Sequence, residues 1–492
     1  MYGNSCSDKE MIENMKVGTG QVPNGQALLE AKEKNLISKY QYAFLAPLSE
    51  KRVRDLPMHH QERIADISSE VSKKKKVVEK KKKVEKLTAE VDKETKREAY
   101  KETRAVVTKH WPKFGPVFDL TAGVFSTLCL KNRTCSVALI LVGGSGKGKS
   151  TFLNLFIDAF KRRPDALLYI DNFTTSALQS GHGDASKKQV EENALFKLTT
   201  NKLFICSDMG PLLRGGNDEQ RRTRFGAIAH WLDGTGISRG TGTHGVVGDK
   251  GKYQTAMVGA TTPINMQMWR AMSTLGPRFL FYQFPDLTAD EFIHGQSVGI
   301  AMEECSTAIV SYIDKVFPKD KNVIESSEWP EDESPKIEKQ CQMYSELTAT
   351  AQTMSEYGET IERPATGHFN ARLAMLMAGM ALAKGKDKVG KAELAMARRL
   401  SIKSTPLSRG PILFSIAAGA QTVKDVVQST GLSPTSVSTQ VEKLESLGIL
   451  KQTSIMPPQK WRYVTTDEYV QSTIEMTTPE VDASELNLRG VE

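Results

Sequence analysis

The sequence predicts an α/β fold built on a parallel β-sheet, followed by a helical region and a C-terminal domain of a different type. Short apolar runs alternate with helical stretches over the middle of the chain. These runs lie at 137–142, 166–170, 202–206 and 255–259, with a further run at 279–284 as a fifth candidate. Buried runs of this length, separated by helices, are typical of parallel sheets. The first run leads directly into a glycine-rich segment and then a helix.

Length and composition place the chain among ordinary soluble proteins. At roughly 150 residues per domain, 492 residues suggest about three domains. The net charge of +8 permits contact with nucleic acid or an anionic surface without requiring it. We see no signal peptide and no apolar run that could span a bilayer, so we expect a cytoplasmic protein with no membrane partner. The six cysteines have neither CxxC nor zinc-site spacing, which is typical of reduced, buried cysteines.

Composition divides the chain into five regions. They are a polar, lysine-rich helical region (1–110), the α/β core (111–286), a helical region (287–404), a C-terminal domain (405–470) and a polar tail (471–492). Neither Pro nor Gly interrupts 61–110, which predicts one long charged helix. Its lysine run at 73–83 has two interpretations, a solvated helix or weak coiled coil, or a basic arm that binds nucleic acid. In the helical region, the segment 369–384 is rich in Ala, Met and Leu and predicts the clearest helix.

The glycine-rich segment fits the phosphate-binding pattern GxxxxGK[ST], the P-loop. It consists of Gly143, Gly144, Ser145, Gly146, Lys147, Gly148, Lys149 and Ser150, and Thr151 follows in the helix. Glycines let consecutive backbone N–H groups converge on phosphate oxygens. Lys149 can reach the β- and γ-phosphates and Ser150 can bind Mg²⁺, so ATP and Mg²⁺ are the expected ligands. Lys147 occupies a variable position of the pattern, and we assign it no catalytic role.

A P-loop also needs a carboxylate at the end of a neighbouring strand to hold the Mg²⁺ shell. Asp171 follows the run at 166–170, and Asp208 follows the run at 202–206. Chain order favours Asp208, because another strand with a polar exit comes next. Asp171 would then belong to an outer strand, where a strand-end cap is the simpler role.

The order of these motifs over 143–400 resembles an AAA+ ATPase, most closely the minichromosome-maintenance and superfamily-3 helicase branch. The resemblance implies an α/β P-loop core with a helical lid. It assigns Asp208 to the Walker B position. The strand at 255–263 resembles the sensor-1 strand, in which Thr261 or Thr262 would read the γ-phosphate.

Two arginines complete the resemblance. Arg278, in Leu-Gly-Pro-Arg-Phe, resembles the arginine finger that reaches the ATP of the neighbouring subunit. Arg372, at the start of the Ala/Met/Leu helix, resembles a sensor-2 arginine, and Arg363 is its competitor. The resemblance therefore implies a homo-oligomer, a hexameric ring.

One residue departs from the AAA+ pattern. A Glu that serves as base for the attacking water usually follows the Walker B Asp, and here that residue is Met209. A hydrophobic side chain can neither orient nor deprotonate water. Either another carboxylate serves, with Asp218 and Glu219 close in sequence, or hydrolysis is slow.

A glycine-rich, basic segment at 233–253 lies between the Walker B and sensor-1 positions. Its glycines suit tight turns. Its candidate DNA contacts are Arg239, His244, Lys250 and Lys252. In the helicase branch this interval holds a hairpin that lines the central pore and touches DNA phosphates, and the resemblance implies that role. The alternative is a mobile surface loop.

The C-terminal domain predicts three helices and a two-stranded hairpin. The helices are expected at 410–418, 422–430 and 435–447, with Ser433 and Pro434 opening the third, and the strands at 450–454 and 461–465. The pattern resembles a winged helix of the MarR and ArsR type. That resemblance implies duplex contacts from Thr435, Ser436, Ser438, Thr439 and Gln440 in the groove, and from Lys451, Lys460 and Arg462 on phosphates. A winged helix used for protein contact is the alternative.

Taken together, these resemblances imply an ATPase that moves DNA. We expect a ring-forming replicative helicase or initiator, of the kind that viruses and mobile elements carry, with single-stranded DNA in its pore. The rival is an ATP-gated DNA-binding transcriptional regulator with little unwinding activity, which Met209 and the MarR-like domain favour. A third class is an ATP-driven protein remodeller.

Overall fold

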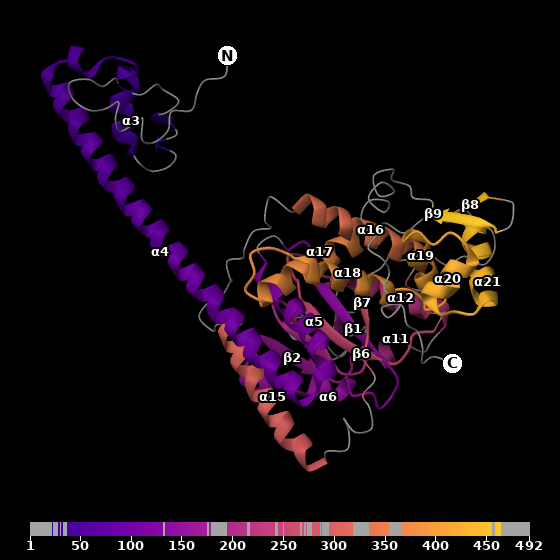
Figure 1. Ribbon diagram of the computed structural model, residues 1–492. Coiled ribbons are helices and arrows are strands. Elements are labelled where there is room, and N and C mark those ends of the chain that lie inside the picture. The colour runs from indigo at the N-terminus through magenta and orange to yellow at the C-terminus, as the bar shows by residue number, and fades with distance from the viewer. Residues whose placement is uncertain are drawn as a thin grey trace. The chain divides into compact units, whose positions relative to one another are not determined.

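A computed structural model of the chain shows an α/β core with helices on both sides of a sheet (Figure 1). It describes residues 22, 28–29, 31–32, 37–130, 133–174, 177–178, 194–213, 217–241, 245–248, 250–265, 268–269, 272, 278–285, 287, 295–317, 334–353, 366–454 and 458–463. The chain divides into two compact units, Met1–Lys93 and Glu94–Glu492.

The N-terminal unit has a small hydrophobic core of its own. Its elements are α3 (Lys39–Leu45), two 3₁₀ helices (Ala46–Leu48 and Val53–Asp55) and the first part of α4 (Met58–His110). Ser38 and Gln41 form a capping box that starts α3. The core includes Leu45, Val53, Ile64, Ile67 and Val71, all at most 4% exposed. The long helix predicted at 61–110 is thus present as α4, and its first turns belong to a packed unit.

A five-stranded parallel sheet forms the centre of the second unit. Its strands are β1 (Val137–Val142), β2 (Leu167–Ile170), β3 (Leu203–Cys206), β6 (Ala256–Thr261) and β7 (Leu280–Gln283). Their order is β2-β3-β6-β1-β7, and every neighbouring pair is parallel. All five predicted strands are confirmed, including the fifth. Because the strands run in the same direction, the segments that follow them meet at one edge of the sheet, which we call the carboxyl edge.

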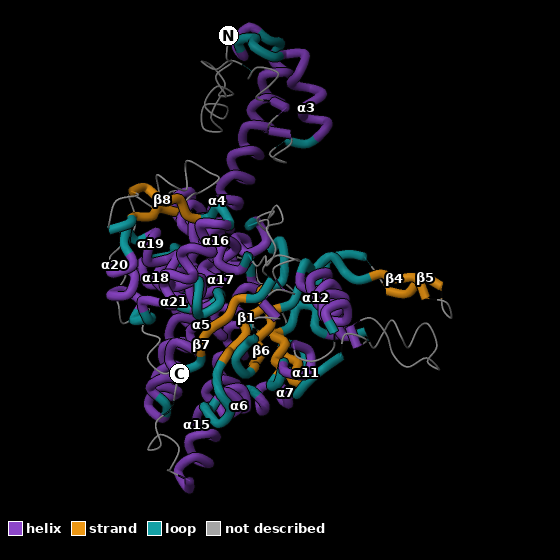
Figure 2. Tube along the Cα trace, turned by 90° about the vertical axis from the view of Figure 1, so that its right-hand side faces the viewer, coloured by secondary structure: helices purple, strands orange, loops and turns teal. Residues whose placement is uncertain are grey.

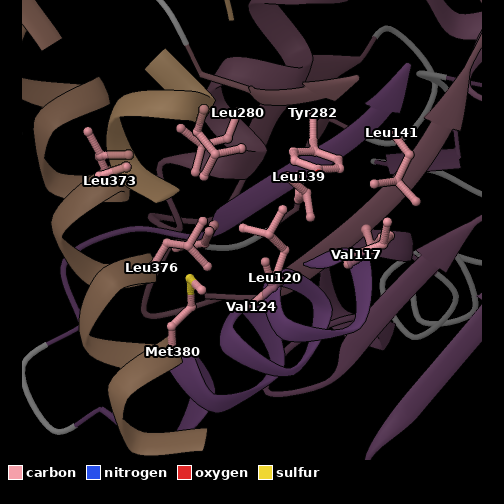
Figure 3. Close-up of a cluster of buried hydrophobic side chains, with 14 of the residues drawn as sticks. Val117, Leu120, Val124, Leu139, Leu141, Leu280, Tyr282, Leu373, Leu376 and Met380 are labelled. Atoms are coloured by element: carbon pink, nitrogen blue, oxygen red, sulfur yellow. The ribbon is translucent and has the colours of Figure 1, made fainter. Parts of the chain in front are cut away.

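Alternate residues of each strand face two separate cores. On one face, Leu139 and Leu141 contact α5 (Gly115–Ser126) and α17 (Gly367–Ala383), as Figure 3 shows. The two helices approach so closely that a Cβ on Gly379 would overlap the carbonyl oxygen of Gly123. On the other face, Ile140 packs with residues of α10 (Leu195–Leu198), α11 (Gly210–Leu213) and α12 (Asp218–Leu232).

The helices of the predicted lid region share one buried core with the sheet. They are α15 (Gly295–Val316), α16 (Ser334–Gln352), α17 and α18 (Lys391–Lys403). Residue Ser404, directly after α18, covers the free edge of the sheet, because its hydroxyl accepts the N–H of Phe281 in β7 at 2.8 Å. The short helices α6 (Lys149–Asn154) and α7 (Ile157–Arg162) follow β1 and pack in the same core.

The C-terminal domain contains the elements predicted for it in the predicted order. They are α19 (Gly410–Ala417), α20 (Val423–Thr430), α21 (Pro434–Ser446), β8 (Leu450–Ser454) and β9 (Lys460–Tyr463), with β8 and β9 antiparallel. Thr422 and Ser433 cap α20 and α21, and Gly431 takes the left-handed conformation between them. Buried residues of α19 join the core of the sheet domain, so the two are packed together.

Two negative findings concern the described residues. None of the described helices is long and apolar enough to cross a membrane. The five described cysteines (Cys129, Cys135, Cys206, Cys305 and Cys341) are buried and form no disulfide.

Candidate nucleotide-binding site

The P-loop connects β1 to α6 at the carboxyl edge. Gly146 and Gly148 have φ angles of 77° and 89°, in the left-handed region that favours glycine. A Cβ on Gly148 would lie 2.6 Å from Cδ1 of Leu287, so the leucine side chain would have to shift, whereas a Cβ on Gly146 would meet nothing within 4 Å. The loop therefore favours glycine at these two positions of the motif because of backbone conformation.

Lys149 is folded against its own loop. Its Nζ donates hydrogen bonds to the carbonyl oxygens of Gly143 at 2.7 Å and Gly144 at 2.6 Å. The side chain is 9% exposed. Burial, together with the charge of Lys147, lowers the pKa of Lys149, while Asp208 acts in the opposite direction. The ammonium group is thus held in the loop by neutral carbonyl oxygens, in a place where an anion would stabilise it further.

The ends of four strands are linked to one another at this edge. The N–H of Gly143 donates to the carbonyl of Thr261 at 3.1 Å, that of Met209 to Ala260 at 2.7 Å, and that of Asp208 to Asp171 at 2.8 Å. These bonds order the residues as P-loop, Thr261, Asp208 and Asp171 across the sheet. Of the two candidate carboxylates, Asp208 is therefore nearer to the P-loop.

Both carboxylates are exposed and have local partners. Asp208 Oδ1 accepts the N–H of Gly210 at 2.8 Å, and Asp171 Oδ1 accepts the hydroxyl of Ser207 at 2.8 Å. Ser150 is exposed at the start of α6. A hydroxyl and a carboxylate are the donors Mg²⁺ uses beside phosphate and water, so the donor set fits this ion. The described residues contain no cluster of three or more His, Cys, Asp or Glu that would hold a metal without such help.

Thr262 carries a polar atom without a partner. Its Oγ1 is buried and makes no hydrogen bond with the residues that the structure describes. An unsatisfied buried hydroxyl costs about 1–3 kcal/mol, and this one follows Thr261, whose carbonyl is bonded to the P-loop, so it is a candidate for contact with a phosphate. Thr261 meets the P-loop through its backbone instead. Between the two candidate sensor threonines, Thr262 is the one whose hydroxyl is available.

Met209 is part of the hydrophobic core. It is 0% exposed and packs in the core beneath β6, where its Cγ would be 2.8 Å from a Cβ on Gly259. Of the two alternative bases, Glu219 is exposed at the start of α12, and the side chain of Asp218 lies outside the described part. The residue directly after Asp208 therefore supplies no carboxylate that could act as the base.

Arg278 and Arg372 lie at the opposite, amino edge of the sheet. Arg278 precedes β7, and the register of β1 and β7, continued by two residues, sets it beside Val137. Val137 is six residues before Gly143, so the distance along the strand from Arg278 to the P-loop is about 20 Å. Both arginines bind Asp233, which follows α12 directly. The structure therefore does not bring these two residues to the P-loop of their own chain. Arg363, the competitor of Arg372, is outside the described residues.

Asp233 is the site residue that sequence reasoning missed. Its Oδ1 accepts Nε of Arg278 at 3.0 Å and Nη2 of Arg372 at 3.1 Å, and its Oδ2 is 3.4 Å from Nη2 of Arg278. Burial alone would raise the pKa of Asp233, but the charges of the two arginines outweigh it and lower the pKa. The only signal in the sequence was an acidic residue at the start of the glycine-rich segment.

The glycine-rich segment forms a hairpin of β4 (Ser238–Thr241) and β5 (Gly245–Gly248). In Figure 2 it projects from the domain beside α12. Lys250 and Lys252 are exposed at its base. The side chain of Arg239 and all of His244 lie outside the described residues.

In the C-terminal domain, the exposed residues of α21 lie opposite its buried face. Val437, Val441 and Leu444 face the core, while Thr439 is exposed and Ser436 and Gln440 are half-buried. Lys451, Lys460 and Arg462 are exposed on the β8–β9 hairpin. Trp461 between them is buried and donates from Nε1 to Glu445 of α21 at 3.3 Å, which fixes the hairpin against the helix.

No protein-family model matches the sequence, and no curated protein matches it significantly.

Proposed function

We propose that this protein is an ATP-dependent DNA motor that hydrolyses ATP at the P-loop and works as a ring of identical subunits. The observation that carries the proposal is the strand order. Because β6 lies between β1 and β3, the P-loop, Thr262 and Asp208 occupy adjacent positions at the carboxyl edge. In this proposal one triphosphate would contact all three groups, with Thr262 as the polar sensor and Asp208 as the carboxylate.

Each group has a distinct task in this proposal. Lys149 would exchange its two carbonyl acceptors for the β- and γ-phosphates, and Ser150 and Asp208 would hold Mg²⁺. The bound ion supplies positive charge to the transferring phosphoryl group. The unpartnered hydroxyl of Thr262 would donate to the γ-phosphate or orient the attacking water.

The amino edge supports action between subunits. Arg278 lies too far from its own P-loop to contact a nucleotide there, and side chains cannot cross about 20 Å. A neighbouring subunit that presents this edge to the carboxyl edge of the next would bring Arg278 to its phosphates. The AAA+ resemblance implies six such subunits.

Two exposed basic surfaces support nucleic acid as the partner. The hairpin with Lys250 and Lys252 would follow a single strand through its phosphates, which requires cations but no base recognition. The C-terminal domain would bind duplex, with Thr439 and Gln440 toward the bases and Lys460 on phosphates. Contact through phosphates makes both interactions depend strongly on salt.

The test is the rate of ATP hydrolysis by the purified full-length protein with and without DNA. A motor is expected to hydrolyse ATP several-fold faster with single-stranded oligonucleotide and to displace a strand from a forked duplex. Absence of ATP binding would contradict the nucleotide site itself. Binding and hydrolysis without a response to single strands would contradict the motor.

A second candidate is an ATP-gated DNA-binding regulator, which the buried Met209 favours. A chain without a base at this position would hydrolyse slowly and use ATP to set its oligomeric state. The same assay separates the two, because a regulator is expected to respond to a particular duplex and not to single strands.

A further inference from the structure

The base of the β4–β5 hairpin is fixed directly to Asp233. Asp233 ends α12, and Gly234 follows with a φ angle of 70°. The two arms of the segment are bonded to each other here, because Tyr253 N–H donates to the carbonyl of Gly234 at 2.9 Å and Gly251 N–H to that of Thr235 at 3.1 Å. The bonded base of the hairpin therefore begins one residue after Asp233.

Asp233 is held differently by its two arginines. Arg372 is 0% exposed and also donates to the carbonyls of Leu232 at 2.9 Å and His368 at 3.0 Å, so α17 fixes it rigidly. Arg278 is 13% exposed and approaches Asp233 from the segment that leads into β7. The first contact anchors the carboxylate in the domain, and the second ties the guanidinium of Arg278 to it.

We propose that Asp233 is a positioning residue that couples the hairpin to Arg278, so that a single strand bound at the hairpin sets the orientation of Arg278 toward the neighbouring subunit. The inference rests on the proposed function. The carboxylate accepts from Nε and Nη2 of Arg278, one edge of the guanidinium. Because two hydrogen bonds hold that edge, moving Asp233 changes the direction of the guanidinium.

The test compares Asp233→Asn with Asp165→Asn in the full-length protein. Asp165 is a matched control, because it also pairs with a buried arginine, Arg163 at 2.8 Å, but has no connection to the hairpin through the contacts described. Asp233→Asn is expected to bind ATP and single-stranded DNA as the wild type does. Its stimulation by a single-stranded oligonucleotide is expected to fall roughly fivefold or more, the lower range of coupling between two sites. Asp165→Asn is expected to keep the wild-type stimulation.

Asp233→Glu provides a second measurement, because it retains a negative charge beside the buried Arg372. This variant should fold even if Asp233→Asn fails to fold. Its stimulation by single-stranded DNA should be reduced, because the added methylene displaces the carboxylate. Wild-type stimulation in a folded variant at position 233, or an equal loss in Asp165→Asn, would overturn the coupling while leaving the motor intact. A wild-type protein that does not respond to single strands would overturn both.

Discussion

The two edges of the central sheet are built on different principles. At the carboxyl edge, the ammonium group of Lys149 donates to two neutral carbonyls of the P-loop. The nearby hydroxyl of Thr262 has no described partner. At the amino edge, a single carboxylate, that of Asp233, bridges Arg278 and Arg372, and the side chain of Arg372 is completely buried. A carboxylate thus contacts the cations of the amino edge, whereas neutral carbonyls hold the lysine of the carboxyl edge.

The pKa shifts at the two edges have different causes. Burial lowers the pKa of Lys149, which means that its charge is disfavoured until an anion approaches. At Asp233 the arginines lower the pKa and favour the charged form. The comparison teaches that the two edges differ in the partner of the buried cation, neutral carbonyls at one edge and a carboxylate at the other, while burial lowers the pKa of Lys149 and of Arg372 alike.

The largest expected effect tests the amino edge. Arg278→Ala is expected to bind ATP almost normally but to hydrolyse it roughly 10³–10⁵-fold more slowly, the range known for arginines supplied in trans. Mixing it with Lys149→Ala should restore part of the rate, because one subunit brings the site and the other the arginine. The measurement is ATPase rate against mixing ratio at fixed total protein.

The control for this experiment is Arg222→Ala, which removes an exposed arginine of α12 and should leave the rate unchanged. No recovery at any ratio, together with a monomer in sedimentation at saturating ATP and DNA, would remove the ring model.

The next effect tests the carboxyl edge. Lys149→Ala removes a charge-assisted contact worth about 1.5–3 kcal/mol, so ATP affinity or turnover should fall at least roughly tenfold. Lys147→Ala, two residues away in the same loop, should change ATP affinity much less, because we assign Lys147 no contact with the phosphates. Titration with a fluorescent ATP analogue measures both. Equal losses in the two variants would mean that the loop binds anions without the geometry of a P-loop.

The carboxyl edge was predictable from the sequence because its signals are local. Apolar runs predicted all five strands, and the glycines that precede Lys149 need their positive φ angles whatever surrounds them. The caps at Thr422 and Ser433 lie within three residues of the groups they bind, so the C-terminal helices were also predictable. The helices and strands of the C-terminal domain occur in the predicted order, and its binding to DNA stays a prediction.

The amino edge was not predictable for the opposite reason. Asp233 is 45 residues from Arg278 and 139 from Arg372, and no local pattern marks a pairing over such separations. The shared core of α5 and α17 has the same origin, because two glycines more than 200 residues apart permit the contact. The helical region was expected to form a lid, yet its packing on the sheet only becomes visible in three dimensions.

A smaller effect concerns the C-terminal domain. Replacing both Lys460 and Arg462 by Ala should weaken binding to a duplex several-fold, because both cations are exposed on the hairpin. The slope of log K against log[salt] should fall by about 2, one for each lost phosphate contact. Lys391→Ala, which removes an exposed lysine of α18, is the control. Fluorescence anisotropy over a salt series gives the slope, and an unchanged slope would contradict a role of this hairpin on DNA.

The smallest expected effect separates function from stability at one hydroxyl. Thr262→Val removes the unpartnered Oγ1 and keeps the shape of the side chain. Because an unsatisfied buried hydroxyl is costly, the variant should unfold at the same or a higher temperature than the wild type. If the hydroxyl donates to the γ-phosphate or to water, its loss should raise the activation barrier for hydrolysis by about 0.5–1.5 kcal/mol. The rate should then fall roughly two- to tenfold.

Thr199→Val is the matched control for this change. Thr199 is completely buried, and its hydroxyl, unlike that of Thr262, has partners: it donates to the carbonyl of Leu195 at 2.9 Å and lies 3.4 Å from Nε1 of Trp231. The same substitution there should lower the melting temperature and leave the rate per folded molecule unchanged. Opposite signs of the two stability changes, with a loss of rate only at position 262, would show that the carboxyl edge keeps a polar group for a ligand at the expense of the fold. A destabilised Thr262→Val with a normal rate would mean instead that this hydroxyl has a structural partner.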